Sequence, residues 1–161
     1  MATRYVNVTG KAYWAKVFEE NRDLTGWDDS LVETGGQYVV MVEADADSIH
    51  ELTMARSQTV DNMKDVPVEK GSTTTVKCVK LRRDHEKYSR KGDLLEWASG
   101  APKIVKDDGK TPWSIEDDGL LGNGTEIVAR VAVYDAGKNV GTRLEAIRVV
   151  NHVPAPDMEV V

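Results

Sequence analysis

Basic and aromatic residues alternate along several stretches of this sequence that have the composition of β-strands. Lys11 and Tyr13 are separated by one residue, and so are Lys80 and Arg82. Because successive side chains of a strand point to opposite faces of a sheet, the two members of each pair share a face. Lysine and arginine bind phosphates, and aromatic rings stack on bases. The pattern therefore indicates a surface for single-stranded nucleic acid, with an ordinary solvated strand surface as the alternative.

The same reasoning, applied along the chain, selects the candidate contact residues. We predict phosphate contacts at Lys11, Lys16, Lys80, Arg82, Arg83, Arg130 and Arg143. We predict stacking on bases at Tyr13, Tyr88, Trp113 and Tyr134. Of the two adjacent rings near the N-terminus, Trp14 is expected in the core beside Phe18, which leaves Tyr13 exposed. These faces depend on strand register, because a slip of one residue would exchange them.

The glycine pair in Gly122-Asn123-Gly124 raises the question of a phosphate-binding loop. Such a loop leads into a helix N-terminus, whose amides and dipole hold the anion, and a P-loop also needs a lysine. Here the glycines precede an alternating β-branched stretch, Ile127 to Val133, and no Gly-Lys-Ser/Thr sequence follows. We therefore predict a tight turn in which glycine and asparagine adopt positive φ.

No other group of residues predicts catalysis or a bound cofactor. His50, His85 and His152 are scattered and match no metal-ligand spacing. The acidic clusters Asp107-Asp108 and Glu116 to Asp118 could bind magnesium, but carboxylates beside glycine are more common as turn formers. No serine, cysteine or lysine has a recognisable activating neighbour. We predict no catalytic residue, no metal site and no cofactor, with a metal-dependent nucleotide-processing enzyme as an alternative.

The elements that position the candidate residues are mostly strands. We predict a long strand over residues 4–18, bent or bulged at Gly10, and one helix over residues 48–64 that a Ser48–Glu51 capping box begins and Pro67 ends. Further strands are expected over residues 37–45, 72–84, 102–105, 125–135 and 142–153, with a polar excursion over residues 85–101. This order predicts a mainly β fold with one α-helix between strands, a small barrel of the oligonucleotide/oligosaccharide-binding (OB) type, although a sandwich is an alternative.

The composition limits the class of protein. The chain has 161 residues, which suits one domain, here residues 1–153 with a short mobile tail over residues 154–161. The net charge of −6 does not exclude phosphate binding, because a local basic face decides it. Cys78 is the only cysteine, so an intrachain disulfide is excluded. The absence of an apolar run of 18 residues or a signal segment predicts a cytoplasmic protein without a membrane partner, in the host cytoplasm if the chain is viral.

Several motifs of the C-terminal half occur in an order that is familiar. A hydrophobic strand leads into Asp108-Gly109-Lys110, and a Gly-x-Gly turn at 122–124 precedes an alternating strand with Arg130. A final strand then has the form Leu-x-x-Ile-x-Val, from Leu144 to Val149. In this order the chain resembles the single-stranded DNA-binding proteins of tailed bacteriophages. Residues 10–18 and 73–81 also lie where that family has strands.

This resemblance implies an OB-fold protein that coats and protects single-stranded DNA in phage replication and recombination, without a catalytic step. It implies single-stranded DNA as the partner, with the polymerase and helicase of the same phage as further partners, and it leaves a homodimer open. Arg130 falls at a basic position of the family's strand. Family members often carry a long acidic tail ending in an aromatic residue, whereas here the tail has only Asp157 and Glu159. A structural or protein-interaction β-domain of a phage, without DNA binding, is the alternative function.

Overall fold

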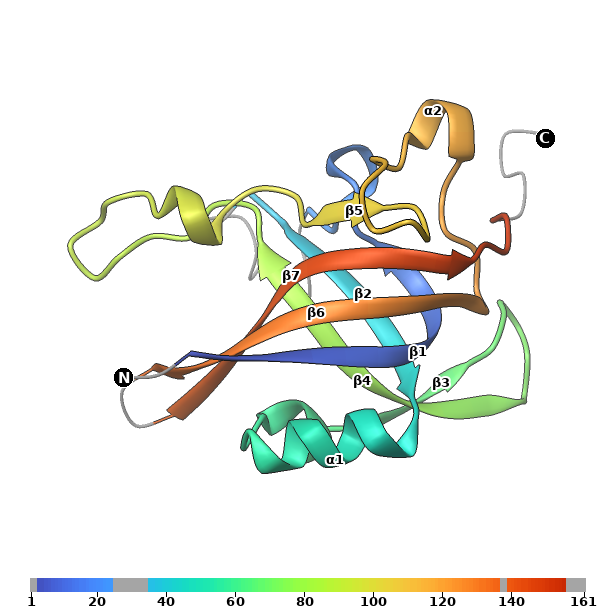
Figure 1. Ribbon diagram of the computed structural model, residues 1–161, viewed down its shortest axis with the longest axis horizontal. Helices are drawn as coiled ribbons and strands as arrows, with labels where there is room; N and C mark the ends of the chain where they lie inside the picture. The colour runs from blue at the N-terminus through green and yellow to red at the C-terminus, as the bar shows by residue number, and fades with distance from the viewer. Residues whose placement is uncertain (1–2, 25–34, 137–138, 156–161) are drawn as a thin grey trace.

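The computed structural model describes residues 3–24, 35–136 and 139–155, which form a twisted sheet closed into a barrel (Figure 1). Its strands are β1 (Arg4–Lys16), β2 (Gln37–Ala44), β3 (Lys64–Pro67), β4 (Thr75–Asp84), β5 (Lys103–Val105), β6 (Thr125–Ala136) and β7 (Asn139–Asn151). Its helices are α1 (Ala46–Met54), α2 (Ile115–Asp118) and the 3-10 turns η1 (Glu19–Asn21), η3 (Gln58–Val60) and η4 (Glu96–Ala98). In the described part of the chain, no helix is long and apolar enough to cross a membrane.

The sheet order is β3-β4-β2-β1-β6-β7-β5. Its pairs are antiparallel except for β5 and β7, which are parallel. The sheet curves until β4 approaches β7, where the Arg83 guanidinium donates a hydrogen bond to the Leu144 carbonyl. One continuous sheet with a helix between β2 and β3 confirms the predicted mainly β, OB-like fold class.

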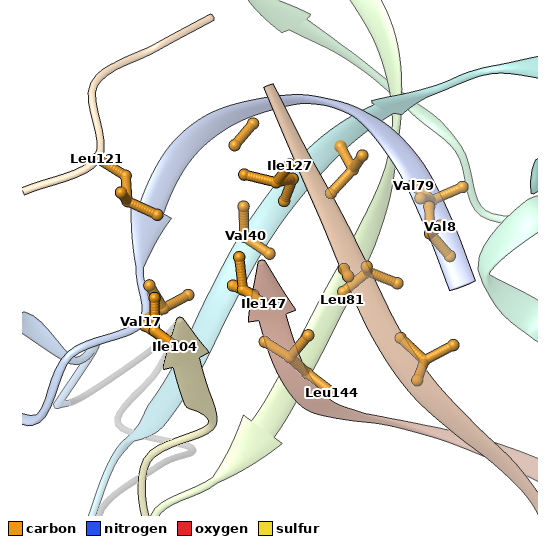
Figure 2. Close-up of a cluster of buried hydrophobic side chains, with 14 of the residues drawn as sticks. Val8, Val17, Val40, Val79, Leu81, Ile104, Leu121, Ile127, Leu144 and Ile147 are labelled. Carbon is orange, nitrogen blue, oxygen red and sulfur yellow. The ribbon is translucent and has the colours of Figure 1, made fainter. Parts of the chain in front are cut away.

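Alternating apolar residues of the strands fill the inside of the barrel. Figure 2 shows this core, in which Val8, Val40, Leu81, Ile127 and Leu144 come from five different strands and are at most 1% exposed. Each such side chain stabilises the fold by about 1.5–3 kcal/mol relative to an exposed position. Because inward and outward residues alternate, the same register fixes which side chains face outward.

The helix between β2 and β3 exists, but the predicted bounds of residues 48–64 are wrong. Asp45, rather than Ser48, caps the helix, because its carboxylate accepts a hydrogen bond from the Ser48 amide at 2.8 Å. The Ser48 hydroxyl instead accepts from the Thr9 amide and joins α1 to β1. The helix ends at Met54, and Arg56 has a positive φ of 63°. The rest of the predicted helix is turns and η3, and its last residue, Lys64, begins β3, a strand that the sequence did not predict.

The irregularity of the first strand also lies elsewhere than predicted. Gly10 keeps regular pairing with Ala44 of β2 and Ile127 of β6. A Cβ atom at this position would collide with the Glu43 carbonyl, so Gly10 permits a close approach of two backbones. The bulge falls between Tyr13 and Lys16. The predicted mobile tail lies largely outside the described residues, which end at residue 155.

Candidate nucleic-acid interface

The outward side chains of β1, β2 and β4 form one surface, the outer face. Its rows follow from the strand register: Lys16 lies beside Val39 and Arg82, Tyr13 lies beside Met41 and Lys80, and Lys11 lies beside Glu43. Four of the predicted phosphate contacts, Lys11, Lys16, Lys80 and Arg82, are thereby brought together. They come from residues 11 to 82 of the chain, so only the pairing of three strands makes them neighbours.

The outer face continues into a hollow of about 470 Å³ between β4 and the start of β7, here called the basic groove. Its lining includes Gln58, Asn62, Lys64, Lys80, Arg82 and Tyr134. A smaller hollow of about 50 Å³ shares Arg82, Tyr134 and Thr142 with it and adds Lys87 and Arg143. The two hollows therefore adjoin and make one path lined by cations and an aromatic ring, which suits a polyanion that carries planar bases.

Lys80 is held close to other cations in the basic groove. Partial burial, followed by the charges of Lys64 and Arg82, lowers the pKa of Lys80 below its ordinary value, with Asp23 opposing the shift. Arg82 is fixed in place, since its guanidinium donates to the Gln37 side-chain oxygen at 3.1 Å. A phosphate placed among these cations would relieve their mutual repulsion and favour the charged form of Lys80.

At the far end of the basic groove, Arg143 lies against two aromatic rings. Its guanidinium carbon is 5.0 Å from the Tyr134 ring centroid and 4.8 Å from that of Trp97, which is cation–π geometry. Its Nε donates to the Glu145 carboxylate at 2.7 Å. Tyr134 lies over Gly141, where a Cβ atom would be 2.5 Å from a ring carbon. The structure thus brings Tyr134 and Arg143 together, with Arg143 already engaged by the rings.

The exposure predicted for the rings at positions 13 and 14 is wrong. Tyr13 is only 6% exposed and packs on the outer side of the sheet against Val66 and Cys78 under the β3–β4 hairpin. This burial raises the pKa of the Tyr13 hydroxyl. Trp14 is 39% exposed, with a φ of 52° in the bulge. The bulge turns Trp14 outward, and its indole N–H donates to the Pro67 carbonyl at 2.9 Å.

Arg83 is buried and is not free to contact a phosphate, so that prediction is corrected. Its guanidinium donates to the carbonyls of Trp97, Ser99, Gly100 and Leu144 and pairs with Glu145 at 3.2 Å. Alternation places it opposite Arg82, on the inner side of β4. Its role is structural: it ties β4 to β7 and to the excursion that precedes β5.

The remaining predicted residues lie apart from the basic groove or already have partners. Trp113 is half-buried against the core, its indole N–H donates to the Gly119 carbonyl, and its ring meets His152 edge-on at 4.8 Å, so it is not placed for stacking on a base. Tyr88 is exposed, and its hydroxyl donates to Glu86. Arg130 is exposed on β6, with its guanidinium 4.5 Å from the ring centroid of Tyr5.

The Gly122-Asn123-Gly124 segment is a turn, as predicted, and it fastens other parts of the chain. The Asn123 side chain accepts from the Trp14 amide at 2.8 Å and donates to the Val68 carbonyl at 3.0 Å. Gly124 has a φ of 93°, whereas Asn123 does not share the positive φ that we expected. A Cβ atom at Gly122 would collide with the Pro154 carbonyl. The turn therefore holds β1, the β3–β4 hairpin and the end of β7 together.

The acidic clusters serve the local chain. Asp108 accepts hydrogen bonds from the Lys110 amide and from the amide and hydroxyl of Thr111, and these bonds lower its pKa to about 2. Asp118 accepts from the Ser114 amide and pairs with Lys106. Within the described ranges, no group of three or more His, Cys, Asp or Glu is arranged to hold a metal ion.

Lys64, Lys87 and Trp97 also lie at or beside the basic groove, although the sequence pattern did not predict them. Lys64 had been assigned to a helix, although it belongs to β3 and lines the basic groove. Lys87 and Trp97 lie in the polar excursion, where no periodicity indicates a face. The only local signal for Trp97 is a large aromatic ring in an otherwise polar segment.

No protein-family model matches this sequence, and no curated protein sequence matches it. Solved structures do match in fold. The single-stranded DNA binding protein gp2.5 of bacteriophage T7 aligns with a TM-score of 0.58 and 14% identity, over 98% of this chain and 92% of that chain. The single-stranded DNA-binding protein of bacteriophage Enc34, in complex with single-stranded DNA, aligns with a TM-score of 0.56 and 9% identity, over 95% of this chain and 89% of that chain. At these identities the similarity establishes a shared fold.

Proposed function

We propose that this chain binds single-stranded DNA without sequence specificity, and that it coats and protects exposed strands during phage DNA replication and recombination. The observation that carries the proposal is the outer face with the basic groove, where Lys11 and Lys16 of β1 and Lys80 and Arg82 of β4 are brought together through β2. The fold is shared with two phage proteins that bind single-stranded DNA.

The charge distribution supports a polyanionic ligand in spite of the net charge of −6. In the described part of the chain, neither Lys64 nor Lys80 forms a salt bridge. Asp84 beside the groove is already shared between Arg82 and Lys87. Asp84 is thus one carboxylate for two cations, and with Lys64 and Lys80 outside any salt bridge of the described residues the groove keeps an excess of positive charge for phosphates.

The proposal also includes the extent of the domain, the cellular compartment and the partners. The chain acts as one domain over residues 1–153, without a catalytic step, in the cytoplasm of the host cell. Its partners are single-stranded DNA and the polymerase and helicase of the same phage. A homodimer fits this function, because neighbouring copies would lie side by side on one strand.

A fluorescence titration tests the proposal, since the chain has four tryptophans as intrinsic probes. The protein is titrated with an oligothymidylate, with a duplex of equal length, and with the oligothymidylate at rising salt. We expect quenching by the single strand, a weak response to the duplex, and a logarithm of affinity that falls by about 0.7 per phosphate contact for each tenfold rise in salt. No binding to the oligothymidylate at low salt would refute the proposal. A stable higher oligomer without DNA affinity would instead favour a protein-interaction domain.

A further inference from the structure

Residues 85–100 form an arm that projects from the barrel between β4 and β5 (Figure 1). Its backbone is held by its own hydrogen bonds, from Ser89 N to Asp93 O, from Leu95 N to Lys87 O and from Gly100 N to His85 O. At its base the Arg83 guanidinium binds three of its carbonyls, as described above. The arm is therefore an ordered extension of the barrel.

Trp97 is the most exposed large apolar side chain of the described residues, at 65%. Its backbone is nevertheless fixed, because its carbonyl accepts from Arg83 at 3.2 Å and the next residue, Ala98, is buried. A ligand that covers this indole would remove its apolar surface from water, which is favourable. A ring that is already in place loses little conformational entropy when it binds, which is the property of a preorganised platform.

The surroundings of the Trp97 ring select the kind of ligand. Arg143 stacks on it, and Lys87 and Arg82 line the adjoining hollow. A planar apolar surface bordered by cations suits a planar group that carries negative charges beside it. A nucleobase with its flanking phosphates has this chemistry, whereas an apolar peptide brings no anion to Arg82 and Lys87, which share the single carboxylate of Asp84.

We propose that Trp97 is a base-stacking subsite, in which one nucleobase of a single strand lies on the exposed indole while the phosphates beside it face Arg82 and Lys87. Arg143 orients the indole from within the Trp97–Arg143–Tyr134 stack. The arm thereby lengthens the path of the strand past the basic groove. This subsite rests on the proposed DNA binding. It adds a contact outside the strands, where the alternation of basic and aromatic residues could not indicate it.

The test compares Trp97→Phe, which keeps an aromatic ring, with Trp97→Leu, which keeps only apolar bulk. Leu94→Ala is the matched control, because Leu94 is also exposed on the arm but is not aromatic. Each protein is titrated by anisotropy with a labelled oligothymidylate and with an abasic oligonucleotide of equal phosphate number. We expect Trp97→Leu to weaken oligothymidylate binding by about 5- to 150-fold, Trp97→Phe to weaken it less, and Leu94→Ala to leave it unchanged.

The abasic oligonucleotide separates stacking from charge and from damage to the arm. We expect it to bind wild type and Trp97→Leu equally, with the same dependence on salt. Equal binding of the oligothymidylate by wild type and Trp97→Leu would overturn the subsite while leaving the proposed function intact. An equal loss with both oligonucleotides would also overturn it, because the change would then have disturbed the arm. If wild type binds neither oligonucleotide, the proposed function itself fails.

Discussion

The basic groove and the turn-rich region around β5 and α2 are both crowded with charged residues, yet they differ in how those charges are used. Around β5 and α2 three carboxylates have local partners: Asp107 pairs with Arg148, Asp108 closes its own turn and Asp118 pairs with Lys106. In the basic groove, partial burial of Lys80, followed by the nearby charges of Lys64 and Arg82, lowers the pKa of Lys80. A cluster whose charges pair with one another stabilises the fold. A cluster of like charges that repel one another is suited to bind a ligand of opposite charge.

The largest expected effect concerns Arg83. This cation lies near the basic groove, but it is paired within the protein, like the carboxylates around β5 and α2. Replacing it with Met leaves one carboxylate oxygen of Glu145 and several carbonyls without the Arg83 donor, although Arg143 still pairs with Glu145, so we expect a loss of about 3–5 kcal/mol in the free energy of unfolding. Urea denaturation measures this loss. A change below 1 kcal/mol would show that the buried guanidinium does not hold β4, β7 and the arm together.

The next effect compares the basic groove directly with the region around β5 and α2, by reversing charges in each and measuring DNA binding. Reversing the charges of Lys80 and Arg82 to Glu should weaken single-stranded DNA binding on the order of 100-fold at low salt, because two phosphate contacts are lost and repulsion is added. The control reverses Lys103 and Lys110 to Glu, two exposed lysines of the β5 region that do not line the groove. Both variants have the same net charge. Equal losses in the two would mean that net charge, rather than the groove, governs binding.

A smaller effect follows from the lowered pKa of Lys80. In the free protein Lys80 loses its proton at a lower pH than an ordinary lysine, whereas a bound phosphate favours the charged form. Affinity should therefore be full below the lowered pKa and fall as the pH rises through it, by up to about tenfold per pH unit. Titrations at alkaline pH measure the fall. Lys80→Arg should flatten this profile, because arginine keeps its charge, and an unchanged profile would exclude Lys80 as its source.

The smallest effect belongs to Asp108. Its folded pKa of about 2 lies below the ordinary value of 3.8, so its contribution to stability is present above pH 4 and disappears as the pH falls through about 2. Asp108→Asn keeps part of the turn's hydrogen bonding but cannot titrate. Thermal unfolding between pH 2 and pH 5 should therefore show a weaker pH dependence for the variant, whereas DNA binding at neutral pH should not change. A loss of DNA binding would show that the β5 region takes part in the interface.

Strand periodicity predicted the fold class and much of the outer face. The alternation of Ile127, Ala129 and Val131 marks β6, and the spacing of Lys80 and Arg82 places both side chains outward. Alternation also puts Arg83 on the opposite face of β4 from Arg82. Applied to both residues, the alternation would have predicted that Arg83 is buried. These features are local, so a single sequence carries them.

The errors have non-local causes. Tyr13 is buried because a hairpin from residues 64 to 84 covers it, and Trp14 is turned outward by a bulge. The strand β3 has a polar sequence and exists through its pairing with β4, which no propensity shows. Trp97 lies in an irregular segment that is held by its own backbone hydrogen bonds and by the buried Arg83. Each error therefore reflects a contact between residues far apart in the chain.

The turn at Gly122 to Gly124 has a consequence for the order in which the protein can be completed. The turn lies before β6, and its Asn123 side chain is hydrogen-bonded to the Trp14 amide and to the Val68 carbonyl. Its Gly122 amide donates to the Val153 carbonyl. Because β1 lies between β2 and β6 in the sheet, the N-terminal strand gains its second neighbour only after residue 136 has been synthesised. Pairings over such sequence separations fold slowly. On the ribosome, the closed barrel and the basic groove, whose lining reaches Thr142, can therefore be completed only when nearly the whole described chain has emerged, so a nascent fragment would not yet present the groove to DNA.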